Sequence, residues 1–258
     1  MTKKPISYNR HLKILDILAE RQKIKVEDLS KILDVSPVTI RRDLDFLDSQ
    51  KLLIRTHGGA SVLQEWEDYL PERAFQEKVD LNKDYKSRIA HKAVEMLKDN
   101  DTIFVNSGTT TLSFISEINK KVHVITNNAR AITNKVNPDI ELMILGGEYR
   151  EASQSLVGIL TIENIQKINS NYTFLGVNGL YSDKGLMTSV LQECSVNNAM
   201  IKNTNDKIIV LADHSKIGRI SNFVTAPCSV IDILITDELT SEEELSKFRD
   251  MGIEIIIA

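Results

Sequence analysis

The sequence is poor in cysteine. Cys194 and Cys228 are the only two in 258 residues, too few for the disulfide framework of a small secreted protein, so a reducing cytoplasm is the expected location. Neither cysteine belongs to a CxxC pair, and the five histidines are scattered along the chain. Metal sites need several such ligands close together. We therefore expect no metal and no cofactor.

Long apolar runs are also missing. No stretch approaches the ~20 apolar residues that cross a bilayer, and residues 1–10 lack the apolar core of a signal peptide. The chain has neither a Gly-Lys-Ser/Thr phosphate loop nor a G-x-G-x-x-G turn. These absences argue against a membrane partner, ATP hydrolysis and NAD binding.

Charge, by contrast, is unevenly distributed. The formal net charge is −4, but residues 1–60 hold twelve Lys/Arg and eight Asp/Glu, whereas residues 61–258 hold 20 and 28. Affinity for phosphodiesters depends on a local basic face and not on the whole-chain sum. A chain of this length suits two domains, and the basic part is the candidate for nucleic-acid binding.

Three short helices are predicted in the basic part. Residues 11–21 and 26–33 place leucines and isoleucines on one side. Ser36 as N-cap and Pro37 at the first helical position then open a third helix. Its buried stripe has helical spacing and comprises Ile40, Leu44 and Leu47.

The opposite side of the third helix carries the candidate DNA contacts. Hydroxyl and guanidinium groups there are of the kind that read base edges and bind phosphates in a major groove. Residues 52–60 follow as a predicted β-hairpin wing with glycines. An isolated Arg-Arg pair is usually a solvated surface, and a turn role for His57 stays open, but the order of elements favours DNA. The candidates are Ser36, Pro37, Thr39, Arg41, Arg42, Arg55, His57 and Gly58.

Two long motifs carry a family resemblance. Residues 35–44 read VSPVTIRRDL and residues 55–60 read RTHGGA. Together they resemble the winged helix-turn-helix of the DeoR family of bacterial transcriptional regulators.

The rest of the chain reads as a linker and an α/β domain. Residues 62–84 show no clean period, and residues 85–97 predict a helix. Short apolar runs separated by helices then indicate a parallel sheet covered on both faces. The runs are 102–105, 122–126, 141–145, 173–177, 208–211, 231–236 and 253–257. Ligands bind such sheets at the carboxyl ends of the strands.

Polar residues gather in the loops after these strands. The loop 106–111 leads into a predicted helix over 112–118, so its backbone N–H groups and hydroxyls suit a phosphate, although plain N-capping is the commoner use of such a turn. Lys216 is the candidate charge partner for that phosphate. The candidate effector residues are Asn106, Ser107, Gly108, Thr109, Thr110, Thr111, Asn127, Gly146, Gly147, Asn178, Glu193, Asp213 and Lys216.

This order of loops resembles the carboxy-terminal sensor of the same DeoR family. The resemblance implies a fold similar to the ribose-5-phosphate isomerase group and a sugar phosphate as effector. Asn106 departs from the family pattern, which often has an acidic residue there. A related sugar or a changed binding pose is compatible with that departure.

The sequence therefore predicts an α/β regulator with a winged helix-turn-helix domain (1–61), a linker (62–84) and a sugar-phosphate-sensing domain (85–258). We expect a non-enzymatic repressor of a sugar uptake or catabolic operon, with double-stranded operator DNA, a phosphorylated sugar and further copies of itself (dimer or tetramer) as partners. Two alternatives remain open. One is an isomerase with Glu193 or Asp213 as general base near Lys216. The other is an architectural DNA binder without a ligand.

Overall fold

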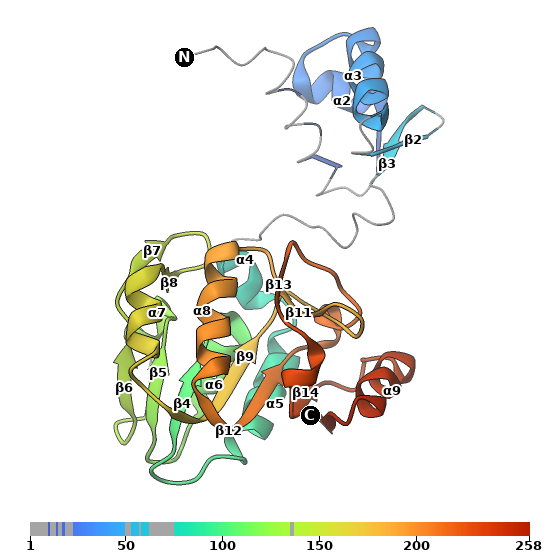
Figure 1. The fold of residues 1–258 in the computed structure, drawn as a ribbon. Coiled ribbons are helices and arrows are strands. Elements are labelled where there is room, and N and C mark those ends of the chain that lie inside the picture. The colour runs from blue at the N-terminus through green and yellow to red at the C-terminus, as the bar shows by residue number, and fades with distance from the viewer. Residues whose placement is uncertain are drawn as a thin grey trace. The chain divides into compact units, whose positions relative to one another are not determined.

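The computed structural model describes residues 10, 14, 17–18, 23–49, 53–56, 58–61, 75–134 and 137–258. The chain divides into two compact units, Met1–Pro71 and Glu72–Ala258, and each is described by itself (Figure 1). Among the described residues, no helix has the length and apolar character needed to cross a membrane.

Helices α2 (Val26–Leu33) and α3 (Pro37–Ser49) form the centre of the first unit. Both lie where the sequence predicts them. Asp34 ends α2 in a left-handed conformation (φ 52°). The Oγ atom of Ser36 then accepts a hydrogen bond of 3.2 Å from the backbone N–H of Thr39, which confirms Ser36 as the N-cap of α3.

Most of the helix predicted over residues 11–21 lies outside the described residues. Ile14, Ile17 and Leu18 are helical, as is Arg10. Ile14 and Leu18 are buried in the core of the first unit. Arg10 pairs with the carboxylate of Asp43 on α3 through two hydrogen bonds of 2.5 and 3.0 Å, so this segment is fixed against α3 by both apolar and ionic contacts.

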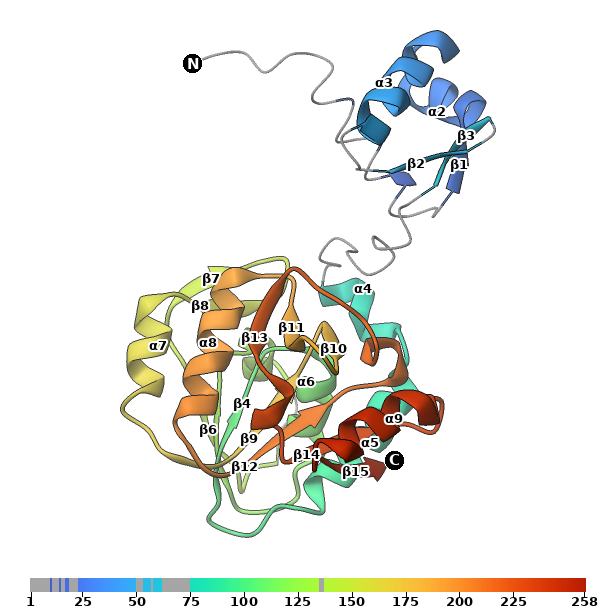
Figure 2. The ribbon, with the colours of Figure 1, turned by 45° about the vertical axis from the view of Figure 1, so that its right-hand side comes forward.

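The wing is a three-stranded antiparallel sheet in the order β1-β3-β2 (Figure 2). Strands β2 (Ile54–Thr56) and β3 (Gly59–Ser61) confirm the predicted hairpin, whereas β1 (Lys23–Lys25) was not expected. A Cβ atom on Gly59 would lie 2.1 Å from the carbonyl oxygen of Ile24. Gly59 therefore serves the pairing of β1 with β3, because any side chain there would push the strands apart.

A seven-stranded parallel sheet, in the order β15-β14-β12-β9-β4-β5-β6, forms the centre of the second unit. All seven predicted apolar runs form its strands, and the parallel arrangement is confirmed. Its strands are β4 (Thr102–Val105), β5 (His123–Thr126), β6 (Glu141–Ile144), β9 (Ser170–Gly176), β12 (Thr204–Leu211), β14 (Ile233–Thr236) and β15 (Glu254–Ile257).

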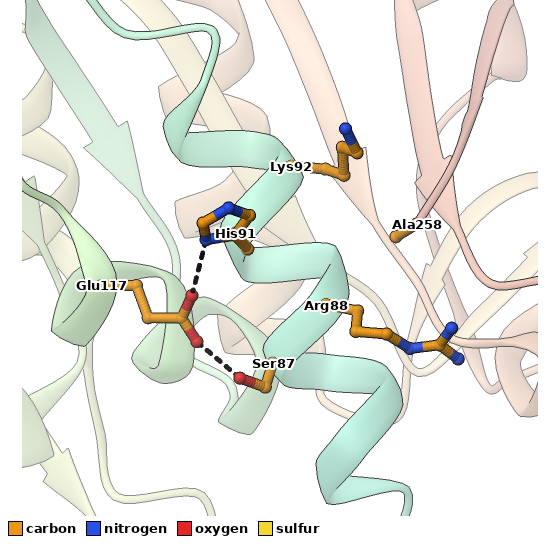
Figure 3. A pocket seen from close by; sticks show the side chains of 6 residues that line it. All are labelled: Ser87, Arg88, His91, Lys92, Glu117 and Ala258. Carbon is orange, nitrogen blue, oxygen red and sulfur yellow. Dashed lines mark hydrogen bonds and ion pairs between the residues drawn. The ribbon is translucent and has the colours of Figure 1, made fainter.

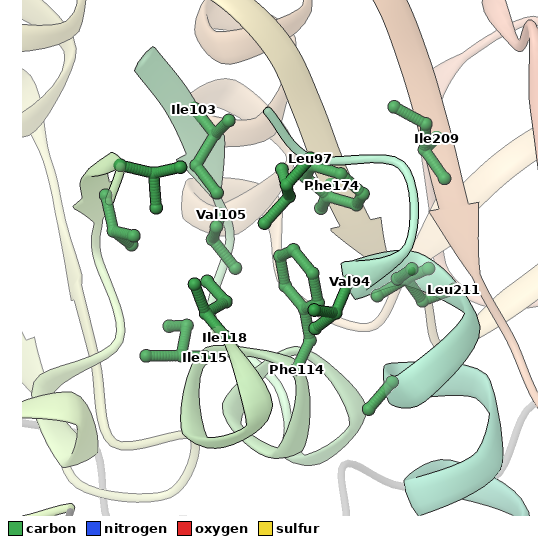
Figure 4. Close-up of a cluster of buried hydrophobic side chains, with 14 of the residues drawn as sticks. Val94, Leu97, Ile103, Val105, Phe114, Ile115, Ile118, Phe174, Ile209 and Leu211 are labelled. Atoms are coloured by element: carbon green, nitrogen blue, oxygen red, sulfur yellow. The ribbon is translucent and has the colours of Figure 1, made fainter. Parts of the chain in front are cut away.

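Helices cover both faces of this sheet. On one face α5 (Lys83–Val94) and α6 (Thr109–Glu117) pack over the cluster drawn in Figure 4, in which Phe114 meets Phe174 with ring centroids 4.3 Å apart. On the other face lie α7 (Ile159–Ile165), α8 (Leu191–Lys202) and α9 (Glu242–Asp250). Alternate residues of each strand serve the two faces, which is why the strands read as continuous apolar runs.

Short antiparallel strands were not expected from the sequence. Strands β7 (Glu148–Arg150) and β8 (Ser155–Val157) pair as a hairpin. A second small sheet joins β10 (Gly179–Tyr181), β11 (Gly185–Thr188) and β13 (Phe223–Ala226). Three or four residues are too few for a recognisable alternation of apolar and polar side chains.

Helix α4 (Phe75–Asp80) lies within residues 62–84, which the sequence suggests are a linker. It belongs to the second unit. Phe75 is buried there, and its backbone N–H donates a hydrogen bond of 2.8 Å to the carbonyl of Ala152 in the β7–β8 turn. Helix α5 likewise begins two residues before the predicted start at Tyr85.

Candidate functional site

The candidate DNA-binding surface is the outer face of α3. Ile40 and Leu44 are fully buried against the first unit's core, whereas Val38 is 55% exposed. Arg41 and Arg42 are exposed as well. The helix therefore presents two guanidinium groups to solvent, on a rigid element whose opposite side is fixed by packing.

Not all candidate residues of this surface are equally available. The hydroxyls of Ser36 and Thr39 lie 2.9 Å apart and form the cap of α3. Pro37 is exposed at the first helical position. In the free protein the two hydroxyls thus organise the start of the helix, and a contact to DNA would be an additional role.

Arg55, the candidate on the wing, forms hydrogen bonds within the first unit. Its Nε atom donates to Asp45 (2.8 Å) and its guanidinium also donates to the carbonyl of Gly59 (2.6 Å). Arg55 thus connects the wing with α3. Gly58 forms the turn with φ +92° and is exposed. His57 lies outside the described residues.

In the second unit, the candidate effector residues lie in loops near the point where the order of the strands reverses. The chain runs outward through β4, β5 and β6, and then returns to place β9 on the other side of β4. Loops on the two sides of such a point diverge, and ligands bind there in open α/β sheets.

Asn106 lies at this point and is satisfied by the protein itself. It is 2% exposed. Its side chain donates to the carbonyl of Gly176 (2.9 Å) and accepts from the N–H of the same residue (2.8 Å). Its amide also donates to Asn197 at 3.2 Å. Asn106 therefore joins β4 to β9, which explains why an uncharged amide occupies a position that the family pattern often makes acidic.

The loop that follows leads directly into α6. Thr111 is fully buried, and its hydroxyl donates to the carbonyls of Asn106 (2.8 Å) and Gly108 (3.2 Å). Ser107, Gly108 and Thr109 are partly exposed, and Thr110 is 8% exposed. Backbone N–H groups at the positive end of the helix are therefore accessible beside two hydroxyl side chains.

Glu193, at the start of α8, lies at the centre of a polar network. It is 8% exposed and accepts hydrogen bonds from Ser155 (3.1 Å) and Thr188 (3.3 Å). Arg150 lies 3.5 Å from its carboxylate. Thr188 also contacts the Asn178 side chain at 3.2 Å. The network brings together the β7–β8 hairpin, β11, α8 and the loop after β9.

Neighbouring loops join this network through further hydrogen bonds. Asn128 donates to the carbonyl of Gly108 (3.1 Å) and forms a β-bridge with Ser155. The N–H of Gly218 donates to Leu180 (2.9 Å), two residues after Asn178. The loops after β4 and β5 are thus bonded to each other, and the loop after β12 is bonded to strand β10.

Three further candidates have mainly structural contacts. The Asn127 side chain donates to the carbonyl of Leu156 (3.0 Å), and its buried Oδ1 atom has no partner among the described residues. The carbonyl of Gly146 accepts from Thr161 (2.7 Å). A Cβ on Gly147 would lie 2.1 Å from the same hydroxyl, so this turn requires glycine.

Asp213 and Lys216 follow β12. Asp213 is 1% exposed and accepts hydrogen bonds from the hydroxyl and N–H of Ser215 and from Asn82. Burial alone would raise the pKa of Asp213, but the bonds from Ser215, the charge of Lys216 and the bond from Asn82 outweigh it and lower that pKa. The carboxylate is therefore ionised.

Lys216 supplies an ammonium group in this loop. Burial lowers the pKa of Lys216 to about 8, against the opposing charge of Asp213. Within the described parts of the chain, its ammonium forms no hydrogen bond and no ion pair within 4.0 Å. A desolvated ammonium without a close partner is suited to bind an anion.

Several residues around Glu193 and around Asp213 were not predicted. Ser155, Thr188 and Arg150 lie on the short strands that the sequence does not reveal. Asn82 precedes α5 and was assigned to the linker. Lys86 could have been found, because helical spacing places it on the same side of α5 as Ile89 and Ala90.

A surface pocket of about 400 Å³ lies elsewhere, between α5, α6 and the carboxyl terminus (Figure 3). Three of its polar groups already pair with each other, since Glu117 accepts from Ser87 (2.7 Å) and lies 3.9 Å from His91. None of the predicted site residues lines it. Among the described residues, no three His, Cys, Asp or Glu side chains are grouped to hold a metal.

These features define a two-part regulator, with a helix-turn-helix unit followed by an α/β unit that carries a buried polar network. The family models agree. Residues 10–65 match the DeoR-like helix-turn-helix domain, and residues 81–238 match the DeoR C terminal sensor domain. The chain belongs to the DeoR family and is a DNA-binding transcriptional regulator.

Curated relatives align over nearly the whole chain. "HTH-type transcriptional regulator GolR" of Listeria innocua is 34% identical over 97% of this chain and 98% of its own length. The "Lactose phosphotransferase system repressor" of Lactococcus lactis subsp. lactis is 35% identical over 92% and 93%. The "Glycerol-3-phosphate regulon repressor" of Escherichia coli K12 is 31% identical over 88% and 90%.

Solved structures show a more distant likeness. Ribose 5-phosphate isomerase A from Methanocaldococcus jannaschii covers 52% of this chain and 54% of its own, with 21% identity and a TM-score of 0.39. The eIF2B beta subunit from Chaetomium thermophilum covers 62% and 50%, with 18% identity and a TM-score of 0.42.

Proposed function

We propose that this protein represses a sugar uptake or catabolic operon, and that a phosphorylated sugar bound in the second unit controls its affinity for the operator. DNA is contacted by α3 and the wing. Such a regulator acts in the cytoplasm. Paired copies, as a dimer or tetramer, would read repeated half-sites, as helix-turn-helix proteins commonly do.

The observation that carries the effector proposal is the combination of Lys216 with the polar network. Lys216 supplies a desolvated ammonium, and the start of α6 supplies backbone N–H groups for an anion. Glu193, Asn178 and Thr188 supply acceptors and donors for hydroxyl groups. A charged end and a hydroxylated body are the two features of a sugar phosphate.

The relatives support the repressor part of this proposal. Two of them are named as repressors of a lactose phosphotransferase system and of a glycerol-3-phosphate regulon. Both names concern the uptake or use of small polyhydroxylated compounds. We extend that role, and not a particular compound, to this chain.

The isomerase alternative finds less support at Asp213, one of its two candidate bases. A general base must take up a proton readily, and its pKa is best near the working pH. The pKa of Asp213 is lowered because Ser215, Lys216 and Asn82 stabilise its charged form. Asp213 is therefore better suited to orient a ligand than to remove a proton from it.

Fluorescence anisotropy on DNA from the protein's own gene neighbourhood tests the proposal. The full chain is titrated onto the DNA with and without pentose and hexose phosphates, and with each free sugar as the matched control. We expect one phosphate to change operator affinity by about 5–150-fold, the usual range of allosteric coupling, while its free sugar has no effect. If free sugar and phosphate act equally, the anion site is wrong. Conversion of the phosphate during incubation would favour the isomerase.

A further inference from the structure

Helix α5 buries a lysine. Lys86 is 4% exposed, although lysine is almost never fully buried unless it is paired. It lies on the inner side of the helix, in line with the apolar residues that pack against the sheet, which are Ile89, Ala90, Ala93 and Val94. A leucine or methionine at this position would fill the same space without the cost of desolvating a charge.

The contacts of Lys86 leave its ammonium incompletely satisfied. Its Nζ atom donates to the backbone carbonyl of Lys78, at the end of α4. Across the described residues this is its one hydrogen bond, and it forms no ion pair within 4.0 Å. Burial lowers the pKa of Lys86 and the charge of Lys78 adds to this, whereas the charges of Asp213 and Asp80 oppose it. An ammonium carries three donors, so two of them have no partner among the described residues.

The same part of α5 is packed onto the loop of Asp213 and Lys216. Asn82, which precedes the helix, donates to Asp213 at 2.9 Å. The ring of Tyr85 meets that of His214 edge-on, with centroids 5.2 Å apart. The start of α5 and this loop are therefore in contact, and the pKa of Lys216, lowered first by burial, is lowered further by the charges of Arg219 and Lys86.

Charge balance in this cluster is incomplete. Asp213 is the buried carboxylate that faces both Lys86 and Lys216. It already accepts hydrogen bonds from Ser215 and Asn82. Asp80 also acts on Lys86 but is exposed at the end of α4, so Lys86 and Lys216 share one buried carboxylate and the cluster suits an added anion.

We propose that Lys86 is a second cation of the effector site and that the phosphate group of the ligand binds between Lys86 and Lys216. This inference rests on the proposed function, because it concerns the same ligand. A phosphate monoester carries nearly two negative charges at neutral pH, which matches two ammonium groups. On binding, the Lys86 ammonium exchanges the carbonyl of Lys78 for a phosphate oxygen.

That exchange would connect the ligand with helix α4. At the end of α4, the carbonyl of Lys78 loses its donor. At its start, Phe75 is bonded to Ala152 in the β7–β8 turn, and Ser155 of that hairpin contacts Glu193. One end of α4 is thus bonded to Lys86, and the other end to the hairpin that carries Ser155. Among the described residues, α4 is also the first helix of the second unit along the chain.

The first experiment uses the wild-type full chain and inorganic phosphate as the probe. In protein labelled with carbon and nitrogen isotopes, the Cε and Nζ chemical shifts of each lysine are followed by NMR against pH, with chloride or phosphate as the anion. We expect phosphate to raise the pKa of both Lys86 and Lys216, and to leave exposed Lys83 unchanged. A change at Lys216 alone would overturn the role of Lys86 while the proposed site stands. No change at either would overturn both.

The second experiment uses the sugar phosphate found with the DNA assay. Lys86→Met removes the charge and keeps the length of the side chain, and Lys83→Met on the exposed side of α5 is the matched control. Loss of a charge-assisted hydrogen bond predicts a fall in ligand affinity of about 10–100-fold for Lys86→Met. Unchanged affinity in folded Lys86→Met would overturn the proposal, and if that variant does not fold, the NMR titration of the wild type decides.

The proposed link between ligand binding and α4 is tested by a separate measurement. At saturating ligand, Lys86→Met should show a smaller change of operator affinity than the wild type, because the Lys78 carbonyl no longer gains or loses a donor. If affinity for the ligand falls but the change at saturation equals that of the wild type, Lys86 binds phosphate and the link with α4 is wrong.

Discussion

The two units of this protein expose their candidate ligand-binding groups in opposite ways. In the first unit, Arg41 and Arg42 project from a regular helix into solvent. In the second unit, Glu193 and Asp213 are 8% and 1% exposed and are held by hydrogen bonds from several loops. The contrast follows from the partners proposed for each. A duplex needs a protruding helix that enters its groove, whereas a small anion needs converging groups shielded from water.

The contrast extends to what holds each group in place. The arginines of α3 depend on one helix, its cap at Ser36 and the buried stripe beneath it. The effector network depends on contacts between loops far apart in sequence, such as Ser155 with Glu193 and Asn82 with Asp213. The following predictions test whether the two units can be damaged separately.

The largest effect is expected on operator binding. Replacing both Arg41 and Arg42 by Ala should weaken it about 100-fold or more, since each base or phosphate contact is worth about 1–3 kcal/mol. The salt dependence of binding should also become shallower. Anisotropy over a range of salt concentrations measures both. Effector binding should be unchanged, and Arg249→Ala, which removes an exposed arginine of α9, is the matched control. Equal operator affinity in the double variant and the control would remove α3 from the DNA interface.

Lys216→Met should affect the other unit alone. We expect effector affinity to fall about 10–100-fold, because a charge-assisted contact to phosphate is lost. Operator affinity without effector should stay the same. Isothermal titration calorimetry measures the first and anisotropy the second. Lys167→Met, at an exposed position after α7, is the control. Normal effector affinity in Lys216→Met would place the phosphate elsewhere.

Two helix-cap substitutions should each destabilise one unit and leave the other unchanged. Ser36→Ala removes the cap of α3, and Ser241→Ala removes the matching cap of α9, where Ser241 accepts from the N–H of Glu244 at 3.3 Å. Each loss should cost about 1 kcal/mol. Amide hydrogen exchange should show faster opening of α3 in the first variant and of α9 in the second. Faster exchange in both units from either change would show that they unfold together.

The smallest effect is expected from pH. Lys216 must be charged to bind an anion, and its pKa in the free protein is about 8. Raising the pH from 7 to 8 should therefore weaken effector binding about twofold. A bound dianion favours the charged ammonium and raises its pKa, so binding at pH 8 should take up protons. Calorimetry in buffers of different ionisation enthalpy measures the sign. Proton release at pH 8 would contradict the assignment of Lys216.

Much of the architecture could be predicted from the sequence. The strands over 102–105 and 208–211 are apolar runs that only a sheet covered on both faces would bury, and α3 is defined by its cap and its periodic stripe. Local rules failed for the β7–β8 hairpin and for α4, because segments of three to six residues take their conformation from their neighbours. The network around Glu193 could not be predicted for the same reason, since partners of Glu193 lie on the β7–β8 hairpin.

By itself, the sequence determined the two-unit organisation, the buried stripe of α3, the seven strands and the family, because each depends on periodicity or on a long motif along the chain. Only the tertiary structure decided what the polar residues do. It assigns Asn106 to the junction of β4 with β9, Gly147 to a tight turn, and Lys86 to the buried surroundings of Asp213. Burial and hydrogen-bond partners decide the charge and the availability of a side chain, and both are set by residues that are distant in sequence.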